Sequence, residues 1–178
     1  MYKMKFYGLG GQGVVTAGKI LCHAYCYQKG KYAKALPAFG HERRGGLVET
    51  DVIIDEQPIL INSFIYDPNV IALFSEGIQE NTETLGGIQE GAILILNTSH
   101  PPVMYHPNIS ACYYVDASGL SLKVLAKNIP NIGMLAALSR AGIACMDALN
   151  AALDILFVET SDDYKKLMER AYHETNRI

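Results

Sequence analysis

The chain has 178 residues, of which 49% are hydrophobic, and a formal net charge of −3 at pH 7. This supply of apolar residues suits one globular domain, so we expect a single domain spanning residues 1–178. The negative charge disfavours a general nucleic-acid binder, which would carry a strong basic excess.

No apolar stretch reaches the ~20 residues that cross a bilayer, and the N-terminus lacks the apolar core of a signal peptide. We therefore expect a cytoplasmic protein with no membrane partner. The four cysteines, which are Cys22, Cys26, Cys112 and Cys145, show no C-x-x-C spacing, so we expect no metal or iron–sulfur cluster on this chain. Cys22 and Cys26 are four residues apart on a predicted helix, where a metal pair is one interpretation and buried apolar thiols are the favoured one.

The first half of the chain alternates short apolar runs with helical patterns. Residues 3–7 predict a strand, and residues 14–28 predict a helix whose apolar residues recur at helical spacing until Gly30 closes it. Gly18 lies on the apolar stripe, where a missing side chain would let the helix approach the sheet closely. A second strand is predicted over residues 32–36, ended by Pro37. Further strands are predicted over residues 47–54, 70–74, 92–97 and 112–115, with a helix over residues 79–85.

The last third of the chain is predicted to be helical. A turn is expected at Asp116-Ala117-Ser118-Gly119, and Ser161 or Asp162 is expected to cap the last helix. The predicted helices span residues 120–128, 132–141, 146–157 and 161 to the C-terminus. Together the elements predict a three-layer α/β/α domain with a mostly parallel, Rossmann-like sheet and a helical C-terminal third.

A first glycine loop follows the first predicted strand and opens the first helix. It has the G-x-G-x-x-G form of a dinucleotide-binding turn, and bare backbone N–H groups at a helix start favour an anion. The alternative is that Gly10-Gly11 only relieves close packing between the strand and the helix. NAD is disfavoured, because a dinucleotide-binding domain needs an acidic residue after the loop to bind the ribose hydroxyls. No Asp or Glu lies between the loop and Glu42, and Lys29, Lys31 and Lys34 lie in that interval instead. The loop reads Gly8-Leu9-Gly10-Gly11-Gln12-Gly13.

A second glycine loop brings acidic and basic side chains between glycines. An arginine there offers a bidentate fork to a carboxylate or phosphate, and Glu42 would orient it; a surface ion-pair patch without a ligand is the alternative. Both loops and residues 97–102 follow predicted strands, so they should share the carboxyl edge of a parallel sheet. The loop reads Phe39-Gly40-His41-Glu42-Arg43-Arg44-Gly45-Gly46.

No catalytic residue is assigned. Ser99 and His100 are neighbours in sequence, which does not establish that they reach each other as nucleophile and base. No pair of acids has a setting that suggests general acid–base catalysis. The chain therefore does not look like a complete enzyme.

The two glycine loops together resemble the gamma subunit, or equivalent domain, of the 2-oxoacid:acceptor oxidoreductases. This family includes the pyruvate, 2-oxoglutarate, 2-oxoisovalerate and indolepyruvate ferredoxin oxidoreductases. The resemblance extends to Gly91 with the strand 93–97, and to the helix start Asn131-Ile132-Gly133-Met134-Leu135. His41 departs from the pattern, because family members often carry a proline before the Glu.

The resemblance implies a subunit that is inactive alone, in an anaerobic pathway that decarboxylates a 2-oxoacid oxidatively to an acyl-CoA and passes electrons to ferredoxin. It implies thiamine-binding alpha and beta subunits and a ferredoxin-like delta subunit, which carry the thiamine diphosphate and iron–sulfur clusters. A free-standing NADP- or flavin-binding oxidoreductase domain stays open as the alternative, as does a purely structural interaction domain. The implied cofactor-side residues, facing CoA or the partner subunits, are Gly8, Gly10, Gly11, Gln12, Gly13, Glu42, Arg44, Gly45 and Gly46.

Overall fold

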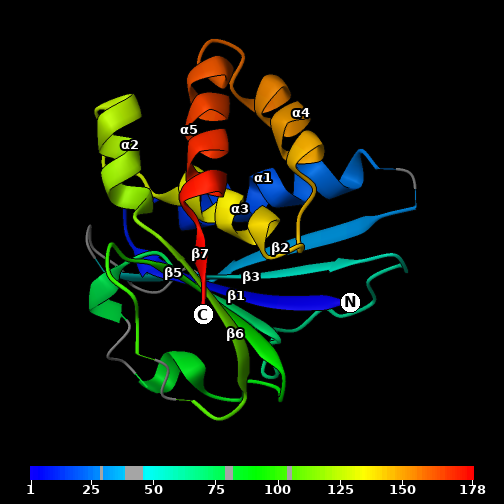
Figure 1. Ribbon diagram of the computed structural model, residues 1–178. Coiled ribbons are helices and arrows are strands. Elements are labelled where there is room, and N and C mark those ends of the chain that lie inside the picture. The colour runs from blue at the N-terminus through cyan, green and yellow to red at the C-terminus, as the bar shows by residue number, and fades with distance from the viewer. Residues whose placement is uncertain (29, 39–45, 79–81, 104–105) are drawn as a thin grey trace.

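The computed structural model describes residues 1–28, 30–38, 46–78, 82–103 and 106–178. Its centre is a seven-stranded sheet in the order β2-β3-β1-β4-β5-β6-β7 (Figure 1). β1, β2, β4, β5 and β6 run in one direction, and β3 and β7 run against them, so the mostly parallel sheet is confirmed. The strands are β1 (Tyr2–Leu9), β2 (Tyr32–Ala38), β3 (Leu47–Asp55), β4 (Val70–Leu73), β5 (Ala92–Asn97), β6 (Ile109–Val115) and β7 (Asn176–Arg177).

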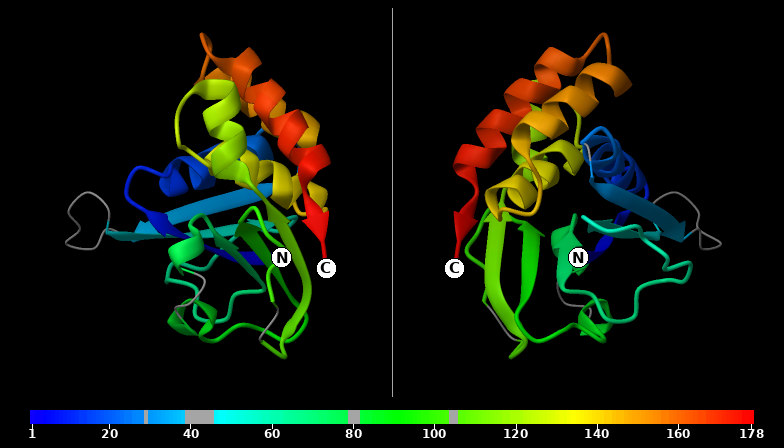
Figure 2. Two further views of the ribbon diagram at one scale, coloured as in Figure 1. Left: turned by 60° about the vertical axis from the view of Figure 1, so that its left-hand side comes forward. Right: turned by 90° about the vertical axis from the view of Figure 1, so that its right-hand side faces the viewer.

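The α-helices gather on one face of the sheet (Figures 1 and 2). α1 packs on β2 and β3, α3 packs on β5 and β6, and α2, α4 and α5 lie outside them. Extended segments and two 3₁₀ helices, η1 (Glu76–Ile78) and η2 (Thr82–Leu85), cover the other face. The expected three layers and helical C-terminal third are confirmed. The α-helices are α1 (Val14–Cys26), α2 (Ala117–Leu125), α3 (Asn131–Arg140), α4 (Met146–Leu156) and α5 (Ser161–Glu174).

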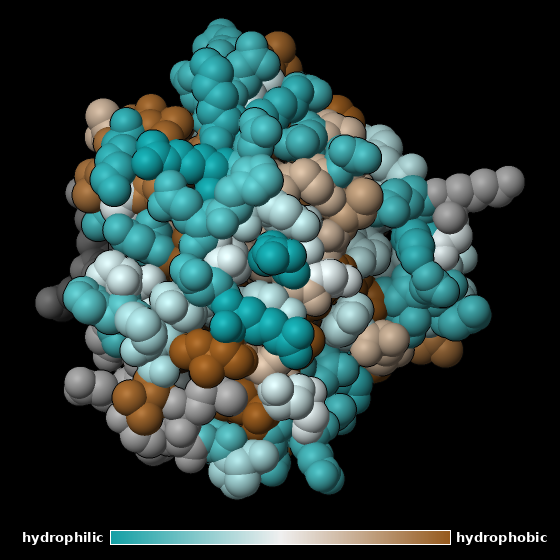
Figure 3. All heavy atoms as spheres, in the orientation of Figure 1, coloured by the Kyte–Doolittle hydropathy of each residue, from teal (hydrophilic) through white to brown (hydrophobic). Residues whose placement is uncertain are grey.

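α3 is the centre of the helical layer. Its first nine residues are all buried, because the sheet lies beneath it and α1, α2 and α5 pack around it. Gly133 lets α2 approach, since a Cβ atom there would lie 2.6 Å from Cβ of Ala117. α5 instead is amphipathic, and hydrophilic side chains cover its outer face (Figure 3).

Gly18 lies where α1 crosses the sheet, as the sequence predicts. A Cβ atom at Gly18 would lie 3.0 Å from Cγ2 of Thr50 and 3.2 Å from Cγ2 of Val52, both on β3. Such distances are tighter than ordinary van der Waals contact, so a larger side chain would push α1 away from the sheet.

A buried ion pair fastens the opposite face of the sheet. Asp51, whose side chain is 1% exposed, has Oδ1 3.0 Å from Nζ of Lys5, and its Oδ2 accepts the Ile65 N–H at 2.6 Å. Glu49 also pairs with Lys5. Burial raises the pKa of Asp51, whereas for Lys5 burial lowers the pKa but hydrogen bonds to Glu49 and Asp51 raise it above its ordinary value. Asp51 therefore holds the segment that follows β3 against the sheet.

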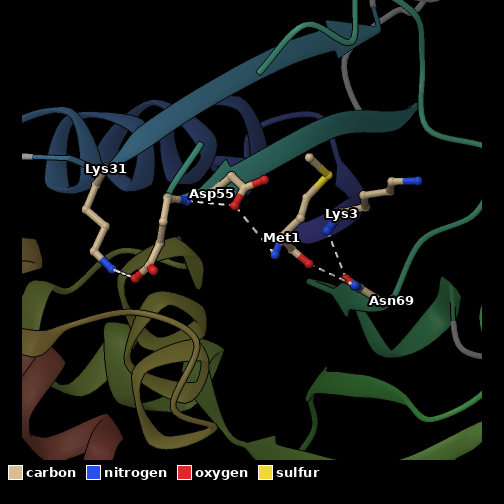
Figure 4. Close-up of polar contacts among 6 residues, drawn as sticks. Met1, Lys3, Lys31, Asp55 and Asn69 are labelled. Atoms are coloured by element: carbon tan, nitrogen blue, oxygen red, sulfur yellow. Dashed lines mark hydrogen bonds and ion pairs between the residues drawn. The ribbon is translucent and has the colours of Figure 1, made fainter. Parts of the chain in front are cut away.

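Asn69 performs a similar function at the start of β4 (Figure 4). Its Oδ1 accepts the Lys3 N–H at 2.8 Å, and its Nδ2 donates to the Met1 carbonyl at 3.2 Å. The Met1 ammonium also lies 3.7 Å from the Asp55 carboxylate. These contacts hold the chain beside β1 just before β4 begins its parallel pairing with β1.

Three local predictions are wrong. β2 continues through Pro37 to Ala38, which an edge strand tolerates. The expected turn 116–119 is the start of α2, because Asp116 caps it by accepting the Gly119 N–H at 2.8 Å. Thr160, without a side-chain cap, precedes α5 in place of Ser161 or Asp162.

Two further differences concern elements rather than their ends. Part of the helix predicted over residues 79–85 is the 3₁₀ helix η2, and residues 79–81 lie outside the described residues. The helix predicted from residue 161 to the C-terminus ends at Glu174, and Asn176–Arg177 form the strand β7, whose two residues carry no apolar pattern.

We expect Gly18→Val to lower the free energy of unfolding by about 2 kcal/mol, because the new methyl groups overpack the α1–β3 contact. Urea unfolding monitored by circular dichroism measures this. Lys19→Val is the control, since Lys19 is exposed on the same helix and the change should cost no more than about 0.5 kcal/mol. Equal losses of unfolding free energy in the two variants would show that the contact between α1 and β3 does not restrict the side chain at residue 18.

We expect Lys5→Met to destabilise the fold by about 3 kcal/mol at pH 7, because it leaves the buried Asp51 charge without its partner. The double variant Lys5→Met with Asp51→Leu should regain part of that loss. The pKa of Lys5 is raised on folding, so its stabilisation is complete below pH 10.5 and is lost as the pH rises through the folded-state value. Urea unfolding between pH 7 and alkaline pH tests both statements. The first is contradicted if Lys5→Met is as stable as the wild type, and the second if the stability of the wild type does not fall at alkaline pH.

Candidate functional site

The first glycine loop forms a closed turn between β1 and α1. The Gln12 N–H donates to the Leu9 carbonyl at 3.1 Å, and the Leu9 N–H donates to Oε1 of Gln12 at 2.7 Å. Gly11 has φ +99° and Gly13 has φ +76°, conformations that favour glycine. Gln12 therefore uses its side-chain oxygen to close the turn.

Two glycines of this loop are explained by packing. A Cβ atom at Gly8 would lie 2.4 Å from Cγ2 of Val14, and one at Gly13 would lie 2.7 Å from Nδ2 of Asn131. Packing with α1 and α3 thus accounts for Gly8 and Gly13 without a bound dinucleotide. The expected relief of close packing is wrong for Gly11, because a Cβ atom there would meet nothing within 4 Å.

The two glycine loops meet. The Gly10 N–H donates to the Gly46 carbonyl at 2.9 Å, directly beyond the antiparallel pairing of Leu9 with Leu47. The shared edge is confirmed for these ends of the loops. The other expected site residues of the second loop, which are Glu42, Arg44 and Gly45, lie outside the described residues.

The third expected segment, residues 97–102, begins at the same edge, because β5 is parallel to β4 and β4 to β1. Asn97 joins three elements there: its Nδ2 donates to the Phe74 carbonyl at 2.7 Å and to Oγ of Ser118 at 2.8 Å. Oγ of Ser99 lies 2.8 Å from Nδ1 of His100, and both side chains are exposed. This pair therefore lies in open solvent without the shielding of a catalytic pocket.

A cavity of about 620 Å³ opens beside the start of α1. Three segments far apart in sequence enclose it: the β1–α1 turn, the connection from α2 to α3, and the connection from α4 to α5, which lie on the same side of the molecule (Figures 1 and 2). Sequence reasoning predicted only the first of these walls. The lining includes Gly11, Gly13, Val14, Thr16, Val124, Leu125, Lys127, Asn131, Phe157, Asp163 and Tyr164.

The start of α1 gives this cavity a positive character. Gly13 offers no capping side chain, and the first turn contains no acid. The first N–H groups of a helix have no partner within it, and the helix dipole adds partial positive charge. Lys127 contributes a full positive charge to the wall and Asp163 a negative one. The region at the helix start can accordingly bind an anion.

The cysteines differ from one another in exposure. Burial raises the pKa of Cys112 to about 12, and burial with the nearby Cys26 raises the pKa of Cys22 to about 12, so both thiols stay protonated at neutral pH. Cys26 and Cys145 are exposed. The expectation of a buried thiol is wrong for Cys26, because it ends α1 beyond the buried stripe. Within the described parts of the chain, no three His, Cys, Asp or Glu side chains are grouped to hold a metal ion.

None of the helices in the described ranges is both long and apolar enough to cross a membrane.

Comparison with known proteins identifies relatives over nearly the whole chain. The family model for pyruvate ferredoxin/flavodoxin oxidoreductase matches residues 3–174. The pyruvate/ketoisovalerate oxidoreductases common subunit gamma of Thermococcus kodakarensis is 32% identical over 98% of this chain and 97% of its own. Pyruvate synthase subunit PorC of Methanothermobacter marburgensis is 33% identical over 88% of this chain and 85% of its own.

A solved structure agrees with these matches. The pyruvate oxidoreductase subunit PORC of Thermotoga maritima superposes with a TM-score of 0.85 at 26% identity, covering 99% of this chain and 97% of that one. The chain therefore belongs to the pyruvate ferredoxin/flavodoxin oxidoreductase family, in which it is similar to gamma subunits.

Proposed function

We propose that this chain is the gamma subunit of a thiamine diphosphate-dependent 2-oxoacid:ferredoxin oxidoreductase of the cytoplasm. The complex decarboxylates a 2-oxoacid oxidatively to an acyl-CoA and passes the electrons to ferredoxin. The observation that carries this proposal is the family match across residues 3–174. Thiamine-binding alpha and beta subunits and a ferredoxin-like delta subunit hold the thiamine diphosphate and iron–sulfur clusters, and this chain alone is inactive.

Within that complex, we assign the edge formed by the two glycine loops to the CoA side. The hydrogen bond from Gly10 to Gly46 supports this, because it joins the last residue of the second loop to the first loop, beside a cavity that reaches the start of α1. Backbone N–H groups of the first loop would face an anionic part of CoA. Glu42 and Arg44 would order the rest of the second loop against CoA or the partner subunits.

The alternative is a free-standing oxidoreductase domain that binds NADP or a flavin. The packing roles of Gly8 and Gly13 weaken it, because they account for two of the three fingerprint glycines without a dinucleotide. Calorimetry of the full chain against NADPH, NADH, FMN and CoA separates the two functions. Tight binding of NADPH or FMN would favour the alternative, whereas weak binding of CoA alone supports the subunit.

We expect the affinity-tagged chain to co-purify with a thiamine-binding subunit from its native cell extract. The assembled complex should reduce ferredoxin when given a 2-oxoacid and CoA, and the isolated chain should not. The physical reason is that the proposal places the thiamine diphosphate and the iron–sulfur clusters on the other subunits, so the isolated chain would lack the groups that pass electrons. A monomer that purifies without such a partner contradicts the proposal.

We expect Arg44→Ala in the assembled complex to lower kcat/KM for CoA about 10- to 100-fold, which is the effect of losing one hydrogen bond to a charged group. Gel filtration should show unchanged assembly. Arg43→Ala is the matched control, since it removes the same charge one residue away. Normal turnover in Arg44→Ala would restrict the second loop to an architectural role.

A further inference from the structure

We propose that the segment connecting β3 to β4, residues 56–69, docks into an uncharged apolar groove on another subunit of the proposed complex. The contact is made by an apolar ridge, which consists of Leu60, Phe64 and Tyr66. This inference rests on the proposed function and deepens it by assigning one contact surface of the chain. In both views of Figure 2 the segment lies on the side of the sheet opposite the α-helices, and none of its residues lines the cavity at the start of α1.

The first observation is the exposure of the apolar ridge. The exposed fractions are 87% for Leu60, 77% for Tyr66 and 47% for Phe64, and the three lie within seven consecutive residues. Single exposed apolar side chains are ordinary on a protein surface, whereas neighbouring large ones mark contact sites. A partner that covered the ridge would remove this apolar surface from water, which is favourable.

The second observation is that polar contacts with the sheet fix the backbone of the segment. Nζ of Lys34, on β2, donates to the Ile61 carbonyl at 2.8 Å. Oδ2 of Asp51, on β3, accepts the Ile65 N–H at 2.6 Å. The segment is therefore attached to two neighbouring strands by side chains that contact its main chain, and its own large side chains are not needed to hold it.

This attachment decides which way the side chains point. Ile65, which is 3% exposed, fills the inward position between the exposed Phe64 and Tyr66. The turn after η2 confines the same stretch from another side, because a Cβ atom at Gly87 would collide with the Tyr66 carbonyl oxygen. The apolar ridge cannot turn inward without breaking these contacts, so the fold itself directs it toward solvent.

The third observation concerns charge. The segment carries two charged side chains, and both are paired within the chain: Asp67 lies 2.6 Å from Nζ of Lys3, and Glu56 pairs with Lys31. The segment thus offers a partner no unpaired charge. A charged group buried against the apolar ridge would lose its hydration without gaining a counter-ion, so the complementary surface is apolar and uncharged.

The shape of the apolar ridge favours a different subunit over a second copy of this chain. A two-fold symmetric contact places the same patch on both sides. Side chains as exposed as Leu60 and Tyr66 protrude, and one protruding ridge does not pack against another at the density of a stable interface. A groove on another subunit can instead enclose the ridge on both flanks.

Assembly of the complex from purified subunits tests this surface. Leu60→Glu and Tyr66→Glu should each raise the Kd of the chain for the other subunits about 30-fold or more, which is the effect of losing a central apolar contact. Leu60→Met keeps an apolar side chain and should stay within about threefold of the wild type. Ile155→Glu is the matched control, because Ile155 is 49% exposed on α4 and the change should leave the Kd unaltered. Every variant should unfold at the urea concentration of the wild type, since each replaced side chain is exposed.

A photo-cross-linking residue at position 60 identifies what covers the apolar ridge. In the assembled complex we expect it to label another subunit, among uncharged apolar residues. Labelling of a second copy of this chain, or of no subunit, overturns the proposal. Glutamate variants that both bind as the wild type does also overturn it, and the proposed function then stands because the chain still assembles. If the wild-type chain does not assemble with thiamine-binding subunits, the proposed function fails together with this surface.

Discussion

The close approach of α1 to the sheet and to α3 is the constraint on which the rest of the structure depends. Three positions along this path have no room for a side chain: Gly8 against Val14, Gly13 against Asn131, and Gly18 against β3. Packing at such distances leaves no slack, since protein interiors are as dense as crystals. The direction of α1 and the position of its first turn are therefore set by the surfaces that it touches.

This packing also builds the candidate site. Because Gly13 lies against Asn131, the start of α1 opens toward the connection between α2 and α3. Because β3 pairs antiparallel with β1, the start of β3 lies beside the end of β1. Gly46 therefore lies within hydrogen-bond distance of Gly10. The turn, the hairpin end and the α2–α3 connection are thus held in one place by contacts that also stabilise the fold. A subunit that presents a surface to partners gains from this rigidity, because less order has to be created on assembly.

The two faces of the sheet differ in the interactions that stabilise them. On the helical face, apolar residues from the sheet and helices form one continuous core. The other face has a smaller apolar cluster, and there the pair of Lys5 with Asp51 and the bond from Ile65 also hold the chain to the sheet. An ion pair in such a position has a high desolvation cost, so its partners depend on each other. The fold is consequently more sensitive to losing one member of the pair than to losing both.

The sequence by itself determined the order of β1 to β6 and of the five α-helices, the three layers and the close approach at Gly18, because these follow from local apolar periodicity and the missing Cβ. It failed at residues 116–119, where the cap by Asp116 extends a helix that the pattern began later, and at Pro37, whose tolerance depends on its strand being at an edge. The outcome at Pro37 is set by neighbours in space, whereas the cap is a local contact between residues three positions apart, which apolar periodicity does not register. Periodicity reports which face of an element is apolar and carries no information about which other element covers it.

The meaning of the glycine fingerprint was decided by the tertiary structure. From the sequence alone, Gly8 and Gly13 fit a dinucleotide turn as well as a packing contact. Only the fold places Asn131 against Gly13 and Gly46 against Gly10, and these contacts join residues 118 and 36 positions apart. No local sequence pattern encodes such contacts, because they depend on the order of the strands in the sheet and on where α3 packs. The sequence determined that the β1–α1 turn would be tight, and the tertiary structure determined what it faces.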